Sequence, residues 1–241
     1  MKPLFLGLTL AASLCAGDPL TGRWQFSFEK SPGSTPEISK FERDGDFFVN
    51  TNGSIHSRFK FDGQPHAAPN AQFDTVIWRQ TGPRAFEHET RKDGRTVYTV
   101  VTQVAPDGQT RQYRHTRYLD GGRTLVYDGV QDRIGGPVDA AHPLLGQWRL
   151  RRLMEWNAES ENVVFSTSNL QFTAPRDAKD HPAKASGRVD TVALRRLDGF
   201  ALEVKGKKGG QPVFTNVYRV AGNTLTVTGD GPGAGVWERV R

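Results

Sequence analysis

The sequence predicts an all-β protein made of two similar units in tandem. Three observations support this prediction: segments of the first half return in the second half, apolar and polar side chains alternate with a period of two, and turn signals such as Asp-Gly and Gly-Gly recur along the chain. A period of two is typical of antiparallel strands with one buried face. Closely spaced turns indicate many short strands, as in a β-barrel or a β-sandwich.

The repeat is clearest at Asp74–Arg79, which returns as Asp190–Arg195 after 116 residues. Self-similarity at a constant shift indicates that one structural unit occurs twice. Each copy also begins with a Gly-x-Trp motif and ends with an acidic residue followed by Arg. These motifs are Gly22-Arg23-Trp24 with Asp132-Arg133 in the first copy and Gly146-Gln147-Trp148 with Glu238-Arg239 in the second.

The N-terminus has the layout of a secretory signal peptide, because Lys2 precedes an apolar run that ends in small residues. The run is shorter than the about 20 apolar residues that cross a bilayer, so we expect an exported protein, periplasmic or extracellular, that is not transmembrane. Leu14 and Ala12 do not fit a lipid-anchor signal, so we expect no lipid anchor at Cys15, the only cysteine. The expected organisation is a signal peptide over 1–17, a first unit over 18–134, a linker over 135–143 and a second unit over 144–241.

The positive charge of the chain lies in its second half. Residues 18–142 carry 16 Lys and Arg against 16 Asp and Glu, whereas residues 143–241 carry 15 against 10. Such an excess favours contact with an anionic polymer of the cell envelope. A nucleic-acid partner is not expected, because no aromatic residues are interleaved with the basic ones to stack on bases.

Each unit is long enough for a small antiparallel barrel of about eight strands. Alternation is clear at Trp24, Phe26 and Phe28, whose intervening residues are polar. Only the segment from Glu155 to Asn169 is compatible with a short helix or lid. One larger sheet or barrel shared by both copies is the alternative to two barrels.

The Gly-x-Trp motif and the closing Arg resemble the lipocalin (calycin) pattern, in which a Trp of the first strand packs beneath an Arg of the last strand. Further short segments resemble those of exported, uncharacterised bacterial lipocalin-like proteins. These segments are Lys30-Ser31-Pro32-Gly33, Phe61-Asp62-Gly63, Asp74-Thr75-Val76 and Lys92-Asp93-Gly94. The resemblance implies two tandem lipocalin-like β-barrels, with Trp24 near Arg133 and Trp148 near Arg239, and a barrel that holds an apolar ligand. The second copy departs from the pattern because it lacks the Lys-Ser-Pro-Gly segment.

The two copies differ in polarity on one predicted strand. The first copy presents Phe86, His88 and Thr90 on one face, and we align this face with Phe200, Leu202 and Val204 of the second copy. A polar side chain inside a barrel needs a partner, water or a ligand, because leaving it unpaired costs about 1 to 3 kcal/mol. We therefore place a small-molecule site in the first copy. Its predicted residues are Trp78, Phe86, His88, Tyr98 and His115.

The sequence contains no serine-hydrolase, phosphate-loop or zinc motif, so we expect no catalytic residue, metal site or cofactor. The first functional hypothesis is a non-catalytic binding protein for a small apolar or amphipathic molecule. The second is a structural or interaction module of the envelope whose barrels are filled by side chains. The third is an enzyme in which His88 or His115 acts as a general base beside Glu87, Glu89 or Tyr113.

Overall fold

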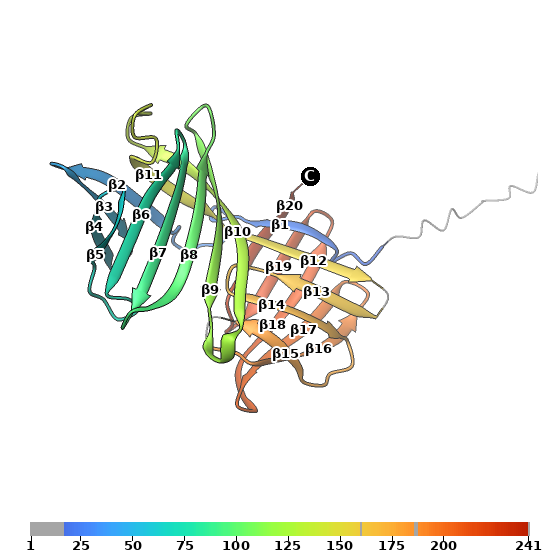
Figure 1. The fold of residues 1–241 in the computed structure, drawn as a ribbon. Helices are drawn as coiled ribbons and strands as arrows, with labels where there is room; N and C mark the ends of the chain where they lie inside the picture. Colours follow the sequence, from blue (N-terminus) through green and yellow to red (C-terminus); the bar gives the residue numbers. More distant parts are fainter. Residues whose placement is uncertain (1–16, 160, 186–187, 241) are drawn as a thin grey trace, which may run out of the picture.

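The computed structural model describes residues 17–159, 161–185 and 188–240, and their strands form two antiparallel barrel-like sheets that lie side by side (Figure 1). The predicted signal peptide, with Cys15, lies outside the described residues except for Gly17. The prediction of an all-β fold with two barrels is confirmed. In the described part of the chain no helix is long and apolar enough to cross a membrane.

The first sheet has ten strands and is curled almost into a barrel, open only between its two end strands, β4 and β5. Its hydrogen-bonded order is β4-β3-β2-β11-β10-β9-β8-β7-β6-β5. The strands are β2 (Ile38–Asp44), β3 (Phe47–Asn52), β4 (Ile55–Phe59), β5 (Asp62–Ala67), β6 (Thr75–Gly82), β7 (Ala85–Lys92), β8 (Arg95–Val104), β9 (Thr110–Tyr118), β10 (Thr124–Gly135) and β11 (Gly146–Arg151). A 3-10 turn, η1 (Asp120–Gly122), joins β9 to β10.

The second sheet is a closed barrel with the order β1-β12-β13-β14-β15-β16-β17-β18-β19-β20. Its strands are β1 (Gly22–Phe26), β12 (Leu153–Glu159), β13 (Asn162–Ser166), β14 (Leu170–Pro175), β15 (His181–Ala185), β16 (Thr191–Asp198), β17 (Ala201–Lys208), β18 (Gln211–Ala221), β19 (Thr224–Gly229) and β20 (Gly235–Val240). Each sheet therefore has ten strands rather than the expected eight. The segment from Glu155 to Asn169 forms most of β12 and all of β13, so the prediction of a helix or lid there was wrong.

The two sheets exchange their first strands. β1 pairs with β12 and β20 of the second barrel, although it precedes every strand of the first sheet in the chain. β11, which follows the linker, pairs with β2 and β10 of the first sheet. The two crossing connections are visible in Figure 1, where β11 leads directly into β12. Whether residues 18–134 and 144–241 behave as separate units stays a prediction, but each sheet takes one strand from the other side of the linker.

The short connection between β11 and β12 explains the exchange. Only Arg152 separates the end of β11 from the start of β12. Neighbouring antiparallel strands need a hairpin loop of at least about two residues, so β11 and β12 cannot lie beside each other in one barrel. The chain instead runs on from the first sheet into the second. This leaves the place next to β12 free for β1.

The exchange also determines which arginine meets the tryptophan of each Gly-x-Trp motif. Trp24 lies beneath Arg239, with the guanidinium carbon 4.1 Å from the ring centre. Trp148 lies beneath Arg133 at 4.3 Å. The predicted pairs of Trp24 with Arg133 and of Trp148 with Arg239 were therefore wrong, because they assumed that each barrel is built from consecutive residues. In each barrel, an arginine of the last strand thus makes a cation–π contact with the tryptophan of the first strand.

The glycine of each Gly-x-Trp motif makes room for this arginine. Gly22 and Gly146 have φ values of +145° and +120°, in the region that favours glycine. A Cβ atom on Gly22 would overlap Nη1 of Arg239, and one on Gly146 would overlap Nη1 of Arg133. The motif thus specifies a strand start over which an arginine side chain lies.

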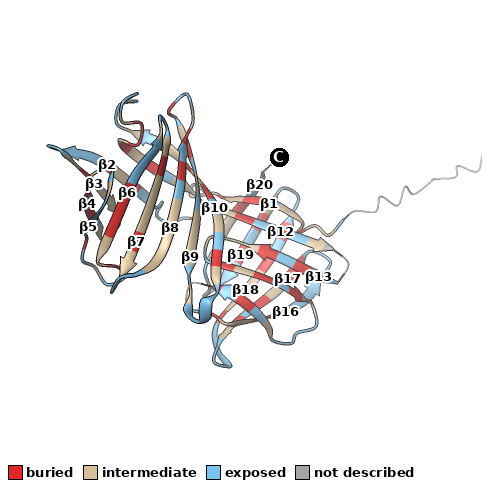
Figure 2. Ribbon diagram, viewed as in Figure 1, coloured by how far each residue is buried: buried red, intermediate tan, exposed pale blue. Residues whose placement is uncertain are grey.

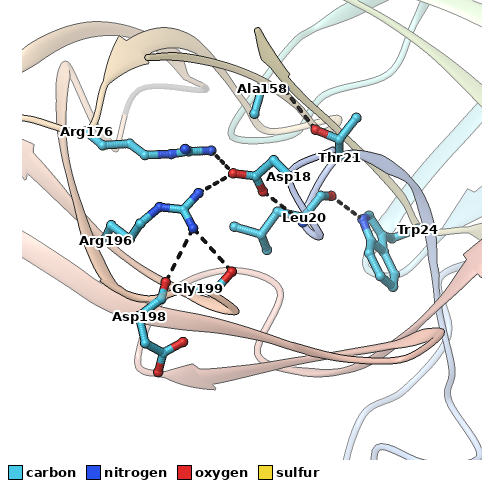
Figure 3. Close-up of polar contacts among 9 residues, drawn as sticks. All are labelled: Asp18, Leu20, Thr21, Trp24, Ala158, Arg176, Arg196, Asp198 and Gly199. Carbon is cyan, nitrogen blue, oxygen red and sulfur yellow. Dashed lines mark hydrogen bonds and ion pairs between the residues drawn. The ribbon is translucent and has the colours of Figure 1, made fainter. Parts of the chain in front are cut away.

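Asp18 fixes the N-terminal end of β1 to the second barrel (Figure 3). Its carboxylate accepts hydrogen bonds from Arg176 and Arg196, and the Asp18 side chain is only 9% exposed. Trp24 Nε1 donates to the carbonyl of Leu20 at 2.9 Å in the same region. The two arginine contacts of Asp18 hold the N-terminal end of the exchanged strand to residues that follow the linker.

Buried and exposed residues alternate along the strands of both sheets (Figure 2). The interior of the second barrel is a large apolar cluster that includes Trp24, Trp156, Phe165, Leu194, Leu202 and Trp237. The apolar cluster of the first sheet is smaller and includes Phe41, Phe59, Trp78, Phe86 and Trp148. The rest of the first interior contains buried polar residues, among them Ser39, Thr90, Thr102, Arg111 and Gln131.

Candidate functional site

A belt of ring side chains crosses the inner face of the first sheet. Each of five consecutive strands, β6 to β10, contributes one ring. In this order they are Trp78, His88, Tyr98, His115 and Tyr127, and we call them the ring belt. All five line the same cavity, so the rings lie together on the inner side of the sheet. Neighbouring ring centres are 4.2 to 5.4 Å apart.

The belt begins with a stack of three rings. Trp78 and His88 are opposite each other on β6 and β7, and their rings are parallel within 5° with centres 4.2 Å apart. Phe59 stacks on the other side of Trp78 at 4.6 Å. Such contacts fix the orientation of the imidazole ring of His88 and leave its edge directed away from the stack.

The ring belt forms one wall of a cavity of about 220 Å³, which we call the inner chamber. Besides the belt, its lining includes Glu37, Ser39, Phe41, Asn50, Asn52, Val100, Thr102, Arg111, Tyr113, Gln131, Leu150, Ser168 and Asn169. Most of these residues belong to the first sheet. Its volume lies below the about 300 to 1,000 Å³ of pockets that enclose a drug-sized ligand, so the inner chamber by itself suits a smaller group or part of a ligand.

Three ring nitrogens on residues that line the inner chamber have no hydrogen-bond partner among the described residues. They are Nε1 of Trp78, Nε2 of His88 and Nε2 of His115, and all three atoms are buried. Buried polar atoms are normally paired, so three orphans in one chamber are unusual. A group that entered the chamber with hydrogen-bonding atoms would recover this unmet capacity.

Both histidines are neutral at neutral pH. Burial lowers the pKa of His88 to about 3, with the charges of His115 and Arg111 adding to the effect. Burial and Arg117 lower the pKa of His115 to about 4. The hydroxyl of Tyr127 lies 2.8 Å from Nδ1 of His115 and has no other partner in the described structure. We assign the phenol as donor, so His115 carries its proton on Nε2 and presents a donor to the chamber.

Arg111 is a buried cation at the deep end of the inner chamber. Its residue exposure is 6%, and its guanidinium carbon lies 4.8 Å from the ring centre of Phe41 and 5.2 Å from that of Trp148. Burial lowers its pKa to about 9, so it remains charged at neutral pH. Its Nε donates to Oε1 of Gln131. No carboxylate of the described residues pairs with it.

A second cavity of about 280 Å³, the outer chamber, adjoins the inner one. The two chambers share Glu37, Tyr113, Tyr127, Leu150, Ser168 and Asn169. The outer chamber also reaches residues of the second barrel, including Met154, Phe165, Leu170, Tyr218 and Trp237. The outer chamber is therefore lined by residues of both sheets and meets the inner chamber around Tyr113 and Tyr127.

The structure brings together four of the five residues that the sequence predicted for the site. Trp78, His88, Tyr98 and His115 all line the inner chamber. Phe86 does not line it, because this residue is buried in the apolar cluster of the first sheet, 5.2 Å from the ring of Phe61. Phe86 is thus part of the apolar core of the first sheet and not of the chamber wall.

The carboxylates of the enzyme hypothesis are not beside the histidines. Glu87 and Glu89 flank His88 in β7, and alternate residues of a strand point to opposite faces. Glu89 is held by Arg91 at 2.7 Å and by Thr96 at 2.8 Å. Tyr113 does share the inner chamber with His115. Neither histidine has a carboxylate partner in the described structure, and their low pKa values make both weak bases.

The second barrel carries apolar residues at the positions that correspond to this site. The pairing of its strands corrects the alignment of the two copies that we made from the sequence. His88 pairs with Trp78, and Val204 pairs with Leu194 in the corresponding strands. Val204, not Leu202, therefore corresponds to His88. Phe200 does not belong to the buried face at all, because it lies in the turn before β17 and is 60% exposed.

A glycine allows the second barrel to fill its own interior. Phe214 is opposite Gly206, and a Cβ atom on Gly206 would overlap the Phe214 ring. In the first sheet the corresponding pair is Tyr98 and Thr90. The side chain of Thr90 blocks this position, so the Tyr98 ring lies against His88 and His115 instead.

Sequence reasoning missed Arg111 and Tyr127, although the signal was present. Arg111 precedes Tyr113 and His115 by two and four residues on β9, so it shares their face. Tyr127 lies six residues before Arg133 on β10 and shares its face for the same reason. Extending the period of two from residues already singled out would have found both.

Among the described residues no group of His, Cys, Asp or Glu side chains is arranged to hold a metal ion. Comparisons with protein-family models, with curated proteins and with solved structures find no match to this chain.

Proposed function

We propose that this chain is an exported, non-catalytic binding protein that holds a small amphipathic molecule in the inner chamber of the first sheet. The observation that carries this proposal is the set of three unpartnered buried ring nitrogens in a chamber walled by rings. Ligand sites are commonly apolar cavities with a few well-placed polar groups. The outer chamber supplies additional apolar surface for the remainder of the ligand.

The second barrel supports the proposal by contrast. Where the first sheet carries Trp78, His88 and Tyr98, the second barrel carries Leu194, Val204 and Phe214, all buried in its apolar cluster. The same arrangement of strands is thus compatible with a fully apolar interior. Polar rings in the first sheet are not required by the fold, and a ligand gives them a role.

We also propose that the two barrels arose by duplication of one lipocalin-like unit. Both sheets have the same strand order when the exchanged strands are counted in place. In both, the indole nitrogen of the first-strand Trp donates to a carbonyl four residues earlier: Trp24 to Leu20 at 2.9 Å and Trp148 to Leu144 at 2.8 Å. Exchange of the first strands would then have followed from shortening of the connection at Arg152.

The binding function is tested with two fluorescent probes that share one ring system. These are the neutral N-phenyl-1-naphthylamine and its anionic 8-sulfonate, 1-anilinonaphthalene-8-sulfonate. Val100 lines the inner chamber between His88 and His115, whereas Val101, the next residue, is 53% exposed on the outer face. Val100→Trp fills the chamber, and Val101→Trp is the matched control.

We expect the full-length protein and Val101→Trp to bind at least one probe with the same affinity, and Val100→Trp to lose at least tenfold in affinity. Circular dichroism of each variant verifies that it is folded. If neither probe binds the wild type, or if Val100→Trp binds as tightly as Val101→Trp, the inner chamber is not a ligand site.

A further inference from the structure

We infer that the inner chamber binds the anionic group of its ligand at the guanidinium of Arg111. This inference deepens the function proposed above and rests on it. The ligand is an amphipathic anion, with its charged group at the deep end of the inner chamber and its apolar part among the rings and toward the outer chamber.

The charge of Arg111 is buried without an opposite charge among the described residues. Its described hydrogen bond is to the neutral side chain of Gln131, and Gln131 in turn donates to Ser39 at 3.4 Å. The one carboxylate in the lining of the inner chamber is that of Glu37. Its side chain is 55% exposed and lies 3.6 Å from Arg152. A buried charge without a partner is unfavourable, and a bound anion would supply that partner.

Hydrogen-bond donors line the same chamber as this cation. Trp78 Nε1 can only donate a hydrogen bond, and His115 Nε2 donates in the tautomer set by Tyr127. Burial raises the pKa of Tyr98 and Tyr113 to about 12, so both phenols keep their protons and can donate as well. A cavity with one cation and several free donors matches a group that accepts several hydrogen bonds, such as a carboxylate, sulfonate or phosphate.

The fold does not need an arginine at this position. Arg111 pairs across the strands with Gln131, two residues before the Arg that covers Trp148. At the same place in the second barrel Leu225 pairs with Trp237, two residues before the Arg that covers Trp24. Leu225 is fully buried and Trp237 is 3% exposed. The second barrel thus closes the corresponding position with apolar packing, and the charge of the first sheet is a specific departure from it.

The inference is tested by comparing the two probes on the full-length protein. The sulfonate of 1-anilinonaphthalene-8-sulfonate is the anion, and N-phenyl-1-naphthylamine has the same rings without it. We expect the wild type to bind the anionic probe about 10- to 100-fold more tightly, the range of a hydrogen bond to a charged group. Arg111→Leu, which copies Leu225, should remove this preference while retaining the neutral probe. Arg111→Lys should restore part of it.

Arg114→Leu is the matched control, because it removes the same charge from the outward face of the same strand. It should keep the preference for the anionic probe. A second readout is thermal unfolding: Arg111→Leu should raise the Tm of the ligand-free protein, since it removes an unpaired buried charge.

The outcomes separate this inference from the proposed function. If Val100→Trp blocks a probe but the wild type binds both probes equally, the chamber binds ligands and the anion site is refuted. The anion site is also refuted if Arg114→Leu and Arg111→Leu lose the preference to the same extent. If neither probe binds, the proposed function fails, and this inference fails with it.

Discussion

Replacement of Trp24 by Ala should weaken the second barrel, although this residue precedes the whole first sheet in the chain. Trp24 is fully buried, its indole nitrogen donates to Leu20, and Arg239 covers its ring. Deleting a buried aromatic side chain of this size costs about 3 to 5 kcal/mol of unfolding free energy. Trp148→Ala is the matched variant, because Trp148 is equally buried but belongs to the first sheet.

Amide hydrogen exchange, read by mass spectrometry at peptide resolution under native conditions, distinguishes the two barrels. We expect Trp24→Ala to accelerate exchange chiefly in β16 to β19, and Trp148→Ala chiefly in β6 to β9. Urea unfolding of the same variants measures the size of the loss. The strand exchange is refuted if Trp24→Ala accelerates exchange in β6 to β9 and leaves β16 to β19 as protected as in the wild type.

Three further predictions concern stability. The two inner-chamber histidines have lowered pKa values in the folded state, so below about pH 6.5 the unfolded state takes up protons that the folded state does not. Urea unfolding should therefore show the free energy of unfolding falling toward pH 4, by up to about 1.4 kcal/mol per pH unit for each histidine. His88→Val should flatten this slope. Gly206→Ala should cost about 1 to 3 kcal/mol because its methyl group would overlap Phe214, and an unchanged unfolding midpoint would contradict this packing. Asp18→Asn should destabilise the second barrel by about 3 kcal/mol, measured in the same way, because it leaves Arg176 buried without its charge partner.

The faces of the strands could be predicted from the sequence, and so could most of the site. The period of two in β9 correctly places Tyr113 and His115 on one side of the sheet. Cross-strand pairing then brings Trp78 against His88. Alternation within strands therefore carries enough information to locate a chamber wall.

The strand exchange could not be predicted from the repeat. Each Gly-x-Trp motif and its closing Arg indicate a contact, but the motif is the same in both copies and does not tell which arginine meets which tryptophan. That choice depends on the length of the connection at Arg152, which becomes visible only when the limits of β11 and β12 are known. Reading Glu155 to Asn169 as a helix concealed it.

The comparison of the two interiors failed at one position for a related reason. Phe200 has the right spacing for the buried face of Leu202 and Val204, but the turn that it shares with Gly199 directs it outward. Spacing alone does not show where a strand begins. The same error in register assigned Leu202 instead of Val204 as the residue of the second copy that corresponds to His88.

The most direct test of the central claim is a crystal structure of the full-length protein with 1-anilinonaphthalene-8-sulfonate. We expect the naphthalene rings to lie among Trp78, Tyr98 and Tyr127, with a sulfonate oxygen within hydrogen-bond distance of Arg111. A bound probe seated only on the outer surface or only among the residues of the second barrel, with the inner chamber free of it, would contradict the account.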